Sequence, residues 1–283
     1  MAANSNTAVD ACPAGGEDID VINFDNSLLD STITLNSPLP IIEKSDVTIN
    51  GLGQDRLAIN GNNTHQIFNV YYSDVIINSL TLENGNADLG GAIYSDGNSK
   101  LTINNSTLSS NSANKGGAIF ASSYTELVIN NSTLTTNSAN IDGGAINANY
   151  DTVATINNSS ISANSASGNG GGVYSYGDSV TIINSTLSTN SATGNGGAMY
   201  SFKADTIISA STLTTNSASA DGGGVFSYED PLIIINSTLS TNSAGSNGGA
   251  VSSYYSATTI NNSVISANYS LFCLLYTSPS PRD

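Results

Sequence analysis

The sequence predicts an all-β fold, a right-handed parallel β-helix (solenoid) of about nine or ten coils of roughly 26 residues each. Isoleucine recurs at an interval of 26 residues, with a single step of 27, at Ile77, Ile103, Ile129, Ile156, Ile182, Ile208, Ile234 and Ile260. Two further aliphatic columns, which begin at Leu82 and Ile93, keep the same period. No segment shows the 3.6-residue period of a helix, so the pattern indicates one unit stacked on copies of itself.

Residues 116–141 illustrate one coil. We expect three short strands in it, at 118–121, 126–130 and 132–136, because aliphatic or β-branched residues alternate there with polar ones. Ile119, Ile129 and Leu134 take the alternating apolar positions and are expected to point inward. Polar corners separate the strands, and successive coils should stack at the usual strand spacing of about 4.8 Å.

Asparagine and glycine mark the corners. One asparagine column begins at Asn105 and is broken only at Ala210, and a second column runs from Asn111 to Asn268. Asparagine tolerates left-handed backbone, so we expect both columns to turn the chain. Their stacked amides are expected to hydrogen-bond from coil to coil. Glycine pairs such as 116–117 and 143–144 should turn the chain at the third corner.

The regularity of the repeat divides the chain into four segments. Residues 1–24 are expected to be a partial N-terminal cap of a truncated precursor, 25–86 irregular first coils, 87–270 regular coils and 271–283 a non-native tail. In the irregular coils we expect strands at 32–35, 46–49, 57–59, 66–70 and 74–77. The tail contains CLLYTSPSPRD, which resembles a translated sequencing adapter, so we expect it to lie outside the coils. Cys12 and Cys273 lie at opposite ends of a rod, so no internal disulfide is expected.

The composition limits the partners of the protein. It has 22 acidic and six basic residues, a formal net charge of −16, and this charge repels nucleic acid and anionic lipid. Neither is expected as a partner. The sequence has no apolar run of membrane-spanning length and no signal peptide after Met1, so we expect no direct membrane insertion of this stretch.

Aromatic residues at outward positions are the first candidate binding site. The first ring column consists of Tyr94, Phe120, Tyr174, Tyr200 and Phe226, and the second of Tyr176, Phe202, Tyr228 and Tyr254. Asn147 and Ser252 interrupt the first column, which favours an exposed position. Exposed aromatic stripes stack on sugar rings or on a partner protein. The alternative is that the rings tie one coil to the next.

Ranks of hydroxyl side chains are a second candidate. The outward threonines beside the Leu82 column are Thr107, Thr133, Thr135, Thr186, Thr212, Thr214 and Thr238, and serine takes about half of the equivalent places. Flat ranks of threonine on a β-helix resemble the ice-facing side of some antifreeze proteins. The alternative is that threonine and serine simply suit an exposed parallel sheet.

No catalytic residue, metal ligand or cofactor is predicted. Cleavage of polysaccharides on this fold, as in pectate-lyase-like enzymes, needs converging carboxylates, often with a base or calcium. The acids do not recur in one column. Asp142 and Asp221 share a position before the glycine pairs that asparagine fills in other coils, which favours a role in the turn. His65 has no acid pair near it in the sequence.

The repeated Gly-Gly-Ala-Ile of residues 90–93, 116–119 and 143–146, together with the Asn-Ser-Ala of 111–113, 137–139 and 242–244, resembles the repeat of bacterial polymorphic outer-membrane proteins and of related secreted β-helix proteins. The resemblance covers about residues 87–270. Where outer-membrane members have Phe-x-x-Asn, this chain has Leu or Ile, as from Leu108 to Asn111. The resemblance implies a secreted or cell-surface location, with the bacterial outer membrane as the expected site, and no settled enzyme activity.

The sequence therefore predicts a non-catalytic surface or secreted module of the adhesin or passenger type. It would bind through many weak contacts along one face of a rod. Glycans or proteins of host or neighbouring cells are the expected partners, and unpaired strand edges predict end-to-end self-association. The alternative function is a carbohydrate-binding or polysaccharide-cleaving β-helix, and ice binding is a third.

Overall fold

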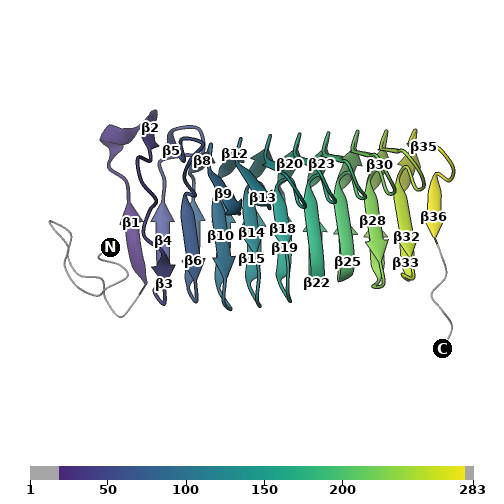
Figure 1. Cartoon of the computed structure of the whole chain (residues 1–283), viewed down its shortest axis with the longest axis horizontal. Coiled ribbons are helices and arrows are strands. Elements are labelled where there is room, and N and C mark those ends of the chain that lie inside the picture. The colour runs from purple at the N-terminus through teal and green to yellow at the C-terminus, as the bar shows by residue number, and fades with distance from the viewer. Residues whose placement is uncertain (1–18, 278–283) are drawn as a thin grey trace.

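The computed structural model describes residues 19–277 and shows one rod of stacked coils (Figure 1). Apart from the short 3-10 helix η1 (Asn26–Leu28), all regular elements in this part of the chain are strands. Strands of successive coils pair in parallel and in register, for example Ile103 with Ile129. The predicted all-β parallel solenoid of about ten coils is confirmed.

The strands form three long sheets that run along the rod. The sheet of 18 strands, here the broad sheet, contains β1 (Asp20–Asn23), β3 (Ile42–Glu43), β4 (Val47–Asn50), β6 (Phe68–Tyr71), β7 (Asp74–Asn78), β10 (Ile93–Asp96), β11 (Lys100–Asn104), β14 (Ile119–Ala121), β15 (Glu126–Asn130), β18 (Ile146–Ala148), β19 (Val153–Asn157), β22 (Val173–Ile183), β25 (Met199–Ser209), β28 (Val225–Tyr228), β29 (Leu232–Ile235), β32 (Val251–Tyr254), β33 (Thr258–Asn261) and β36 (Leu275–Thr277). The sheet of ten strands, the hydroxyl sheet, contains β2 (Ser31–Thr34), β5 (Leu57–Asn60), β8 (Thr81–Glu83), β12 (Thr107–Ser109), β16 (Thr133–Thr135), β20 (Ser160–Ser162), β23 (Thr186–Ser188), β26 (Thr212–Thr214), β30 (Thr238–Ser240) and β34 (Val264–Ser266). The sheet of eight strands, the narrow sheet, contains β9 (Asn86–Leu89), β13 (Ser112–Lys115), β17 (Ser138–Ala139), β21 (Ser165–Ala166), β24 (Ser191–Ala192), β27 (Ser217–Ala218), β31 (Ser243–Ala244) and β35 (Tyr269–Ser270).

The division of one coil into sides differs from the prediction. Residues 118–121 and 126–130 were expected on separate sides, but β14 and β15 lie in the same broad sheet. The third side is β17, which the sequence did not reveal. The reason is its length: β17 has two residues, and only Ala139 is buried, so no alternating pattern can be seen.

The interior is one continuous column of aliphatic side chains. Ile119, Ile129 and Leu134 are fully buried, as predicted. Each stacks on its equivalents in the neighbouring coils, as Leu134 does between Leu108 and Ile161. Full burial of such a side chain contributes about 1.5–3 kcal/mol, so the interior columns hold the coils together.

The two asparagine columns have different roles. Asn131 and its equivalents have positive φ, 49° at Asn131, and Ala210 adopts the same conformation at 48°. The prediction of a left-handed corner is therefore right for this column. For the second column it is wrong: Thr136, the residue before Asn137, has the positive φ. The side chain of Asn137 is instead buried inside the corner.

That buried column forms the amide ladder expected from the sequence. The Asn137 Nδ2 donates to Asn164 Oδ1 at 3.0 Å and to the Leu108 carbonyl at 3.0 Å. Asn137 Oδ1 in turn accepts from the backbone N–H and the Nδ2 of Asn111. Each amide thus satisfies two backbone groups of the preceding coil and bonds to the amides on both sides, so this buried polar side chain has its partners.

The glycine pairs meet two separate demands. The first glycine of a pair turns left-handed, with φ of +72° at Gly143. At the second, Gly144, a Cβ would lie 2.0 Å from the Gly171 carbonyl oxygen of the next coil. Only glycine allows so close an approach of two backbones.

The structure modifies the expected ends of the repeat. The strands expected in residues 25–86 are confirmed within one or two residues. However, β1 already pairs with β4, so the first coil begins before residue 25. At the other end β36 pairs with β32, so part of the tail does continue the broad sheet. Cys273 is exposed and unpaired, and Cys12 lies outside the described residues.

The single step of 27 residues comes from two separate changes. From Ala113 to Ile119 the chain advances six residues, but from Ala139 to Ile146, at the same corner, it advances seven. Along the broad sheet, the chain advances ten residues from Ile146 to Ile156, but only nine between the equivalent residues of β22, Val173 and Ile182. Residues 139–166, here the junction coil, combine the longer corner with the longer side. The N-terminal coils (87–138) and C-terminal coils (167–270) therefore have the same length but divide it differently.

Candidate functional site

The first ring column stacks as a ladder. Tyr94 and Phe120 have ring centroids 5.8 Å apart, and Tyr200 lies 5.1 Å from both Tyr174 and Phe226, with nearly parallel planes. No ring takes the position of Asn147, which separates Phe120 from Tyr174 in the sheet register. This column therefore ties coil to coil, as the alternative interpretation held.

The expected exposure is wrong for two members of the first ring column, whereas Tyr94, Tyr174 and Tyr200 are half-buried. Phe120 and Phe226 are only 5% and 6% exposed, and Asn147 and Ser252 are fully buried. The corner residues before the glycine pairs lie against this column, since Asn147 Nδ2 donates to the Asp142 carbonyl. The sequence could not reveal this cover, because outward-facing residues of a sheet are buried only when another segment folds over them.

Burial also changes the phenols of this column. It raises the pKa of Tyr174 well above its ordinary value and that of Tyr200 to about 12, and the nearby carboxylate of Asp142 adds to both effects. Both phenols are therefore neutral hydrogen-bond donors across the physiological pH range.

In the sheet register Tyr254 follows Tyr228, as predicted, but its ring turns towards the first ring column. Its ring lies 5.6 Å from that of Phe226, and its hydroxyl donates to Asp221 Oδ2 at 2.9 Å. It thus covers the space that the small side chain of Ser252 leaves. The second column ends instead at Tyr255, which lies edge-on to Tyr228 at 5.5 Å.

The second ring column offers the more open aromatic surface. Tyr176, Phe202 and Tyr228 stack at 5.3 and 5.2 Å and are half-buried. Lys203 Nζ lies 5.4 Å from the Phe202 ring centroid and 3.4 Å from Glu229 Oε2. This arrangement gives a ribbon of rings with a charged edge, which can hold a flat apolar face of a ligand.

The predicted threonines all lie on the hydroxyl sheet, in register from coil to coil. Thr107 pairs with Thr133, and Thr186 with Thr212, and their side chains are half-buried or exposed. Several hydroxyls bond to one another across coils, such as Ser162 Oγ to Thr135 Oγ1 at 3.2 Å. The sheet therefore satisfies part of its own hydrogen-bonding capacity.

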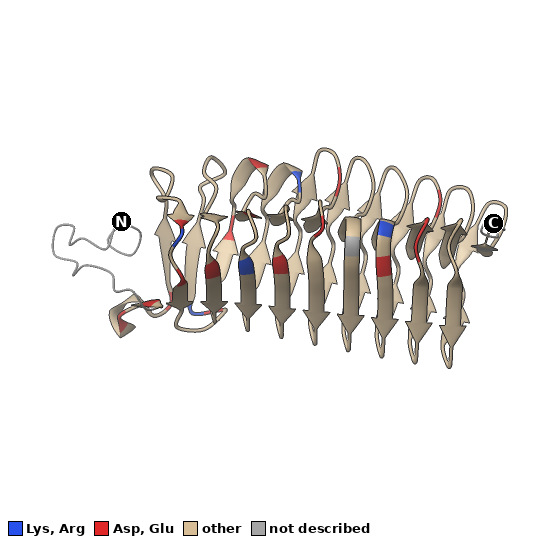
Figure 2. Cartoon of the chain, turned by 90° about the horizontal axis from the view of Figure 1, so that it is seen from below, with Lys and Arg blue, Asp and Glu red and all other residues tan. Residues whose placement is uncertain are grey.

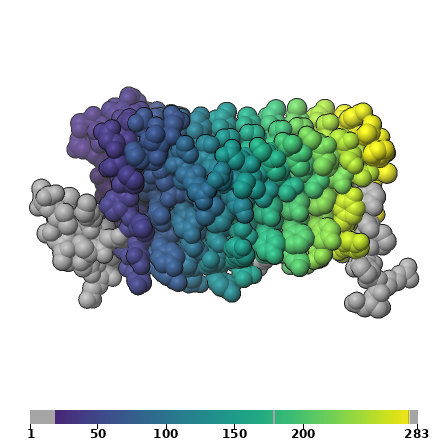
Figure 3. Space-filling view, viewed as in Figure 1, coloured from purple at the N-terminus to yellow at the C-terminus, as the bar shows by residue number. Residues whose placement is uncertain are grey.

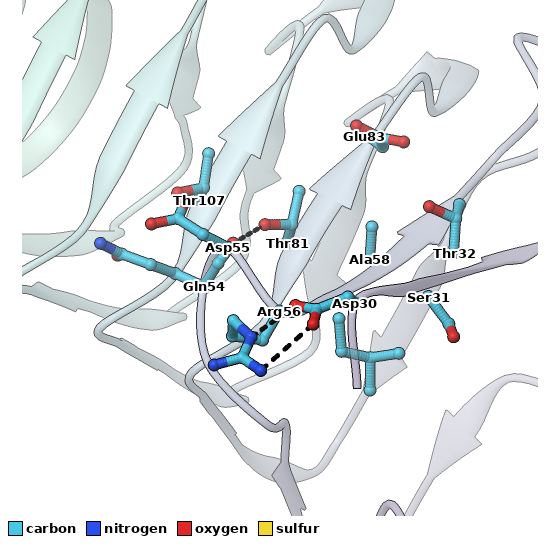
Figure 4. A pocket seen from close by; sticks show the side chains of 11 residues that line it. Asp30, Ser31, Thr32, Gln54, Asp55, Arg56, Ala58, Thr81, Glu83 and Thr107 are labelled. Carbon is cyan, nitrogen blue, oxygen red and sulfur yellow. Dashed lines mark hydrogen bonds and ion pairs between the residues drawn. The ribbon is translucent and has the colours of Figure 1, made fainter. Parts of the chain in front are cut away.

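A polar pocket lies beside the N-terminal strands of the hydroxyl sheet (Figure 4). Sequence reasoning missed it. Its volume is about 370 Å³. The turn from β4 to β5 has six residues, against two between β11 and β12, and it carries Gln54, Asp55 and Arg56 to the pocket. This length difference is the signal in the sequence that could have located it.

Arg56, the cation of this pocket, forms an ion pair with Asp30. Arg56 Nη2 lies 3.2 Å from Asp30 Oδ2, its Nε bonds to the other carboxylate oxygen, and this bonding raises the pKa of Arg56. Both side chains are more than half exposed. The guanidinium is therefore already engaged. The Thr81 hydroxyl donates to the Gln54 carbonyl and Glu83 Oε1 accepts from Asn60 Nδ2, so the pocket satisfies most of its own polar groups.

Acidic residues are scattered along the rod (Figure 2). Within residues 19–277, no group of three or more His, Cys, Asp or Glu could hold a metal ion. The turn role expected for Asp142 and Asp221 is confirmed, because their Oδ1 atoms accept the backbone N–H of Asn169 and Asn247 at 2.8 and 2.7 Å. Asn195 links the two halves of this ladder, since its Oδ1 accepts from Asp221 N.

Three parallel sheets, a periodic aliphatic interior and glycine-paired corners define a β-solenoid repeat protein. Residues 105–122 match the Chlamydia polymorphic membrane protein repeat, a match that runs from the Asn105 corner through β12 and β13 to β14. The predicted resemblance is confirmed at this level. No curated protein and no solved structure matches the chain. Residues 19–277 contain no helix with the length and apolarity that crossing a membrane requires.

Proposed function

We propose that the protein is a surface-exposed binding module of the passenger type, and that it holds glycans along the second ring column. The repeat match and the solenoid fold support a place at the cell surface, since that repeat is named for a membrane protein. The space-filling view shows an even, elongated surface, which suits repeated contacts better than a single deep cleft (Figure 3).

The observation that carries the proposal is the stack of Tyr176, Phe202 and Tyr228. Its rings repeat once per coil at 5.2–5.3 Å, and each keeps part of its surface open. Sugar rings present apolar C–H faces that pack on aromatic rings, and several weak contacts of this kind sum to a useful affinity. In the first ring column, by contrast, Phe120 and Phe226 are buried and leave little surface for a sugar.

Binding of oligosaccharides to the purified protein tests this function. A glycan array identifies the probe, and titration calorimetry compares the wild type with the double variant Phe202→Ala plus Tyr228→Ala. We expect the double variant to lose at least about tenfold in affinity. The matched control is Thr133→Ala plus Thr212→Ala on the hydroxyl sheet, which should bind as the wild type does.

Two results would argue against the proposal. One is unchanged affinity in the ring variant, and the other is equal loss in the control, which would assign binding to the hydroxyl sheet. Thermal melts of both variants check that the coils remain folded.

A further inference from the structure

A second cavity lies where the two kinds of coil meet, and the irregular step of the repeat creates it. Its volume is about 340 Å³, within the usual range for small-molecule sites. Asn114 and Lys115 contribute the short corner of the N-terminal coils, and Ile141 contributes the first long corner. Phe120 and Tyr150 line it from the broad-sheet side.

Ile141 is unusual for its position. Its carbonyl accepts the N–H of Gly168, and the same corner ladder continues through Gly194, Ala220 and Ser246. These four members are small, and a large apolar residue returns only at Phe272 near the end of the rod, whereas Ile141 is a large apolar residue that is 44% exposed. The cavity thus has an apolar wall that the next four coils do not repeat.

The stack of the first ring column is interrupted beside this cavity. Phe120 stacks on Tyr94, but on its other side the sheet register holds Asn147 in place of a ring. Tyr150 stands beside the cavity with 60% of its surface exposed. Tyr150 therefore offers open aromatic surface at the cavity, while its ring lies edge-on to Tyr176 of the next coil at 6.0 Å.

Two polar groups at the cavity lack partners. Lys44, Arg56, Lys100 and Lys203 each form an ion pair, whereas Lys115 is the one described cation that forms none. Asn149 is only 7% exposed and its Oδ1 accepts from Tyr150 N, but its Nδ2 donates to no group of the described chain. This Nδ2 atom is not one of the fully buried atoms without a partner, so it is open to a ligand hydroxyl or to water at the cavity.

The carboxylate of Asp88 is the remaining charge at the cavity. It lies more than 4 Å from Lys115 Nζ, since no ion pair joins them, and Asn114 Nδ2 donates to its Oδ1. Its second oxygen is open to a ligand hydroxyl. The cavity therefore combines one cation, one amide donor, one carboxylate acceptor and an apolar wall.

We propose that this cavity binds one acidic sugar residue, a uronic acid or a similar carboxylated pyranose. The sugar carboxylate would meet Lys115 Nζ, the C–H face of its ring would pack on Tyr150 and Ile141, and its hydroxyls would bond to Asn149 Nδ2 and Asp88. The proposal rests on the glycan-binding function proposed above, but it uses different residues from the second ring column.

The test compares two sugars that differ only in the charged group. Methyl β-D-glucuronide and methyl β-D-glucoside are titrated into the full chain by saturation-transfer NMR at millimolar concentrations. We expect the wild type to prefer the glucuronide by about tenfold, because a charge-assisted hydrogen bond replaces a neutral one. Lys115→Gln should abolish this preference and keep the weak binding of the glucoside. Lys203→Gln, a lysine beside another ring, is the control and should leave the preference unchanged.

Three results would overturn the inference: a preference that survives Lys115→Gln, equal loss in Lys203→Gln, or equally strong binding of N-acetylglutamate amide. The last would mean that the site recognises acidic peptide side chains. Ile141→Gly, which copies the later coils, should weaken both sugars without lowering the melting temperature. Failure of this site is separable from failure of the proposed function, because the latter depends on Phe202 and Tyr228.

Discussion

The N-terminal and C-terminal coils bury equivalent interiors but differ on their outer surface. Ile103 in one and Ile208 in the other are both fully buried in the same column. Yet β14 and β15 are separate strands in an N-terminal coil, whereas β22 and β25 are each continuous over 11 residues, with left-handed backbone at Gly177 and at Lys203. These continuous strands bring Tyr176 and Phe202 into a stack, and the N-terminal coils have no equivalent of it among the described residues.

The difference shows which parts of a coil can change length. One residue is gained at the glycine corner and one is lost on the broad sheet, and neither change shifts an inward side chain. A change inside a strand would reverse the faces of all residues beyond it, because side chains alternate every residue. Corners therefore vary and create surface features, while strands keep the interior constant.

Single-residue deletions should have the largest effects, and they test whether corners tolerate a change of length that strands do not. Deleting Val128 from β15 should turn Ile129 outward and abolish cooperative unfolding, because a buried column would meet polar residues. Deleting Ile141 should only convert the long corner into the short one and lower the free energy of unfolding by about 1 kcal/mol or less. Circular dichroism melts measure both. Equal loss of structure in the two variants would refute the distinction between corner and strand.

Two glycines near the junction coil should differ strongly when replaced by alanine. At Gly144 the new Cβ would collide with the Gly171 carbonyl, so we expect a loss of about 3 kcal/mol or more. At Gly177 the nearest atom is 3.5 Å away and only the φ of +81° is unfavourable, so about 1–2 kcal/mol is expected. Denaturant unfolding measures the two values. Similar losses would mean that backbone conformation, not the approach of coils, requires these glycines.

The buried amide ladder should contribute more than the surface one. Asn164→Ala removes the acceptor of Asn137 and the donor to the Leu134 carbonyl, and should cost about 2–3 kcal/mol. Asn130 belongs to a half-buried ladder with Asn104 and Asn157, where water can substitute, so Asn130→Ala should cost about 1 kcal/mol or less. The ratio of the two losses, measured in urea, is the decisive quantity.

The smallest expected effect concerns alkaline pH. The pKa of Tyr200 is raised to about 12 by burial, so the folded protein favours the neutral phenol. Its contribution to stability is complete below pH 10 and declines as the pH rises from 10 towards 12. Tyr200→Phe should flatten this part of the curve of melting temperature against pH, and absorbance at alkaline pH should lose a late-titrating phenol. A curve identical to that of the wild type would contradict the burial of this ring.

The period was readable from the sequence because every coil repeats the same burial. One inward column such as Ile129 fixes the register of all others, and the predicted strands agree with the structure within one or two residues. The narrow sheet was not readable, since β17 offers a single inward alanine. The candidate sites were only partly predictable: the ring columns were identified, but Phe120 and Phe226 are buried, and the ring of Tyr254 packs on Phe226 of the other column.

The sequence by itself determined the solenoid, its coil length, its interior columns and its corners, because these follow from local alternation repeated at a fixed period. Only the tertiary structure decided which outward side chains remain accessible. Phe120 is buried although it faces outward on its sheet, and Lys115 forms no ion pair although Asp88 of the neighbouring coil lines the same cavity. Such relations join residues of different sides and different coils, so no local pattern contains them.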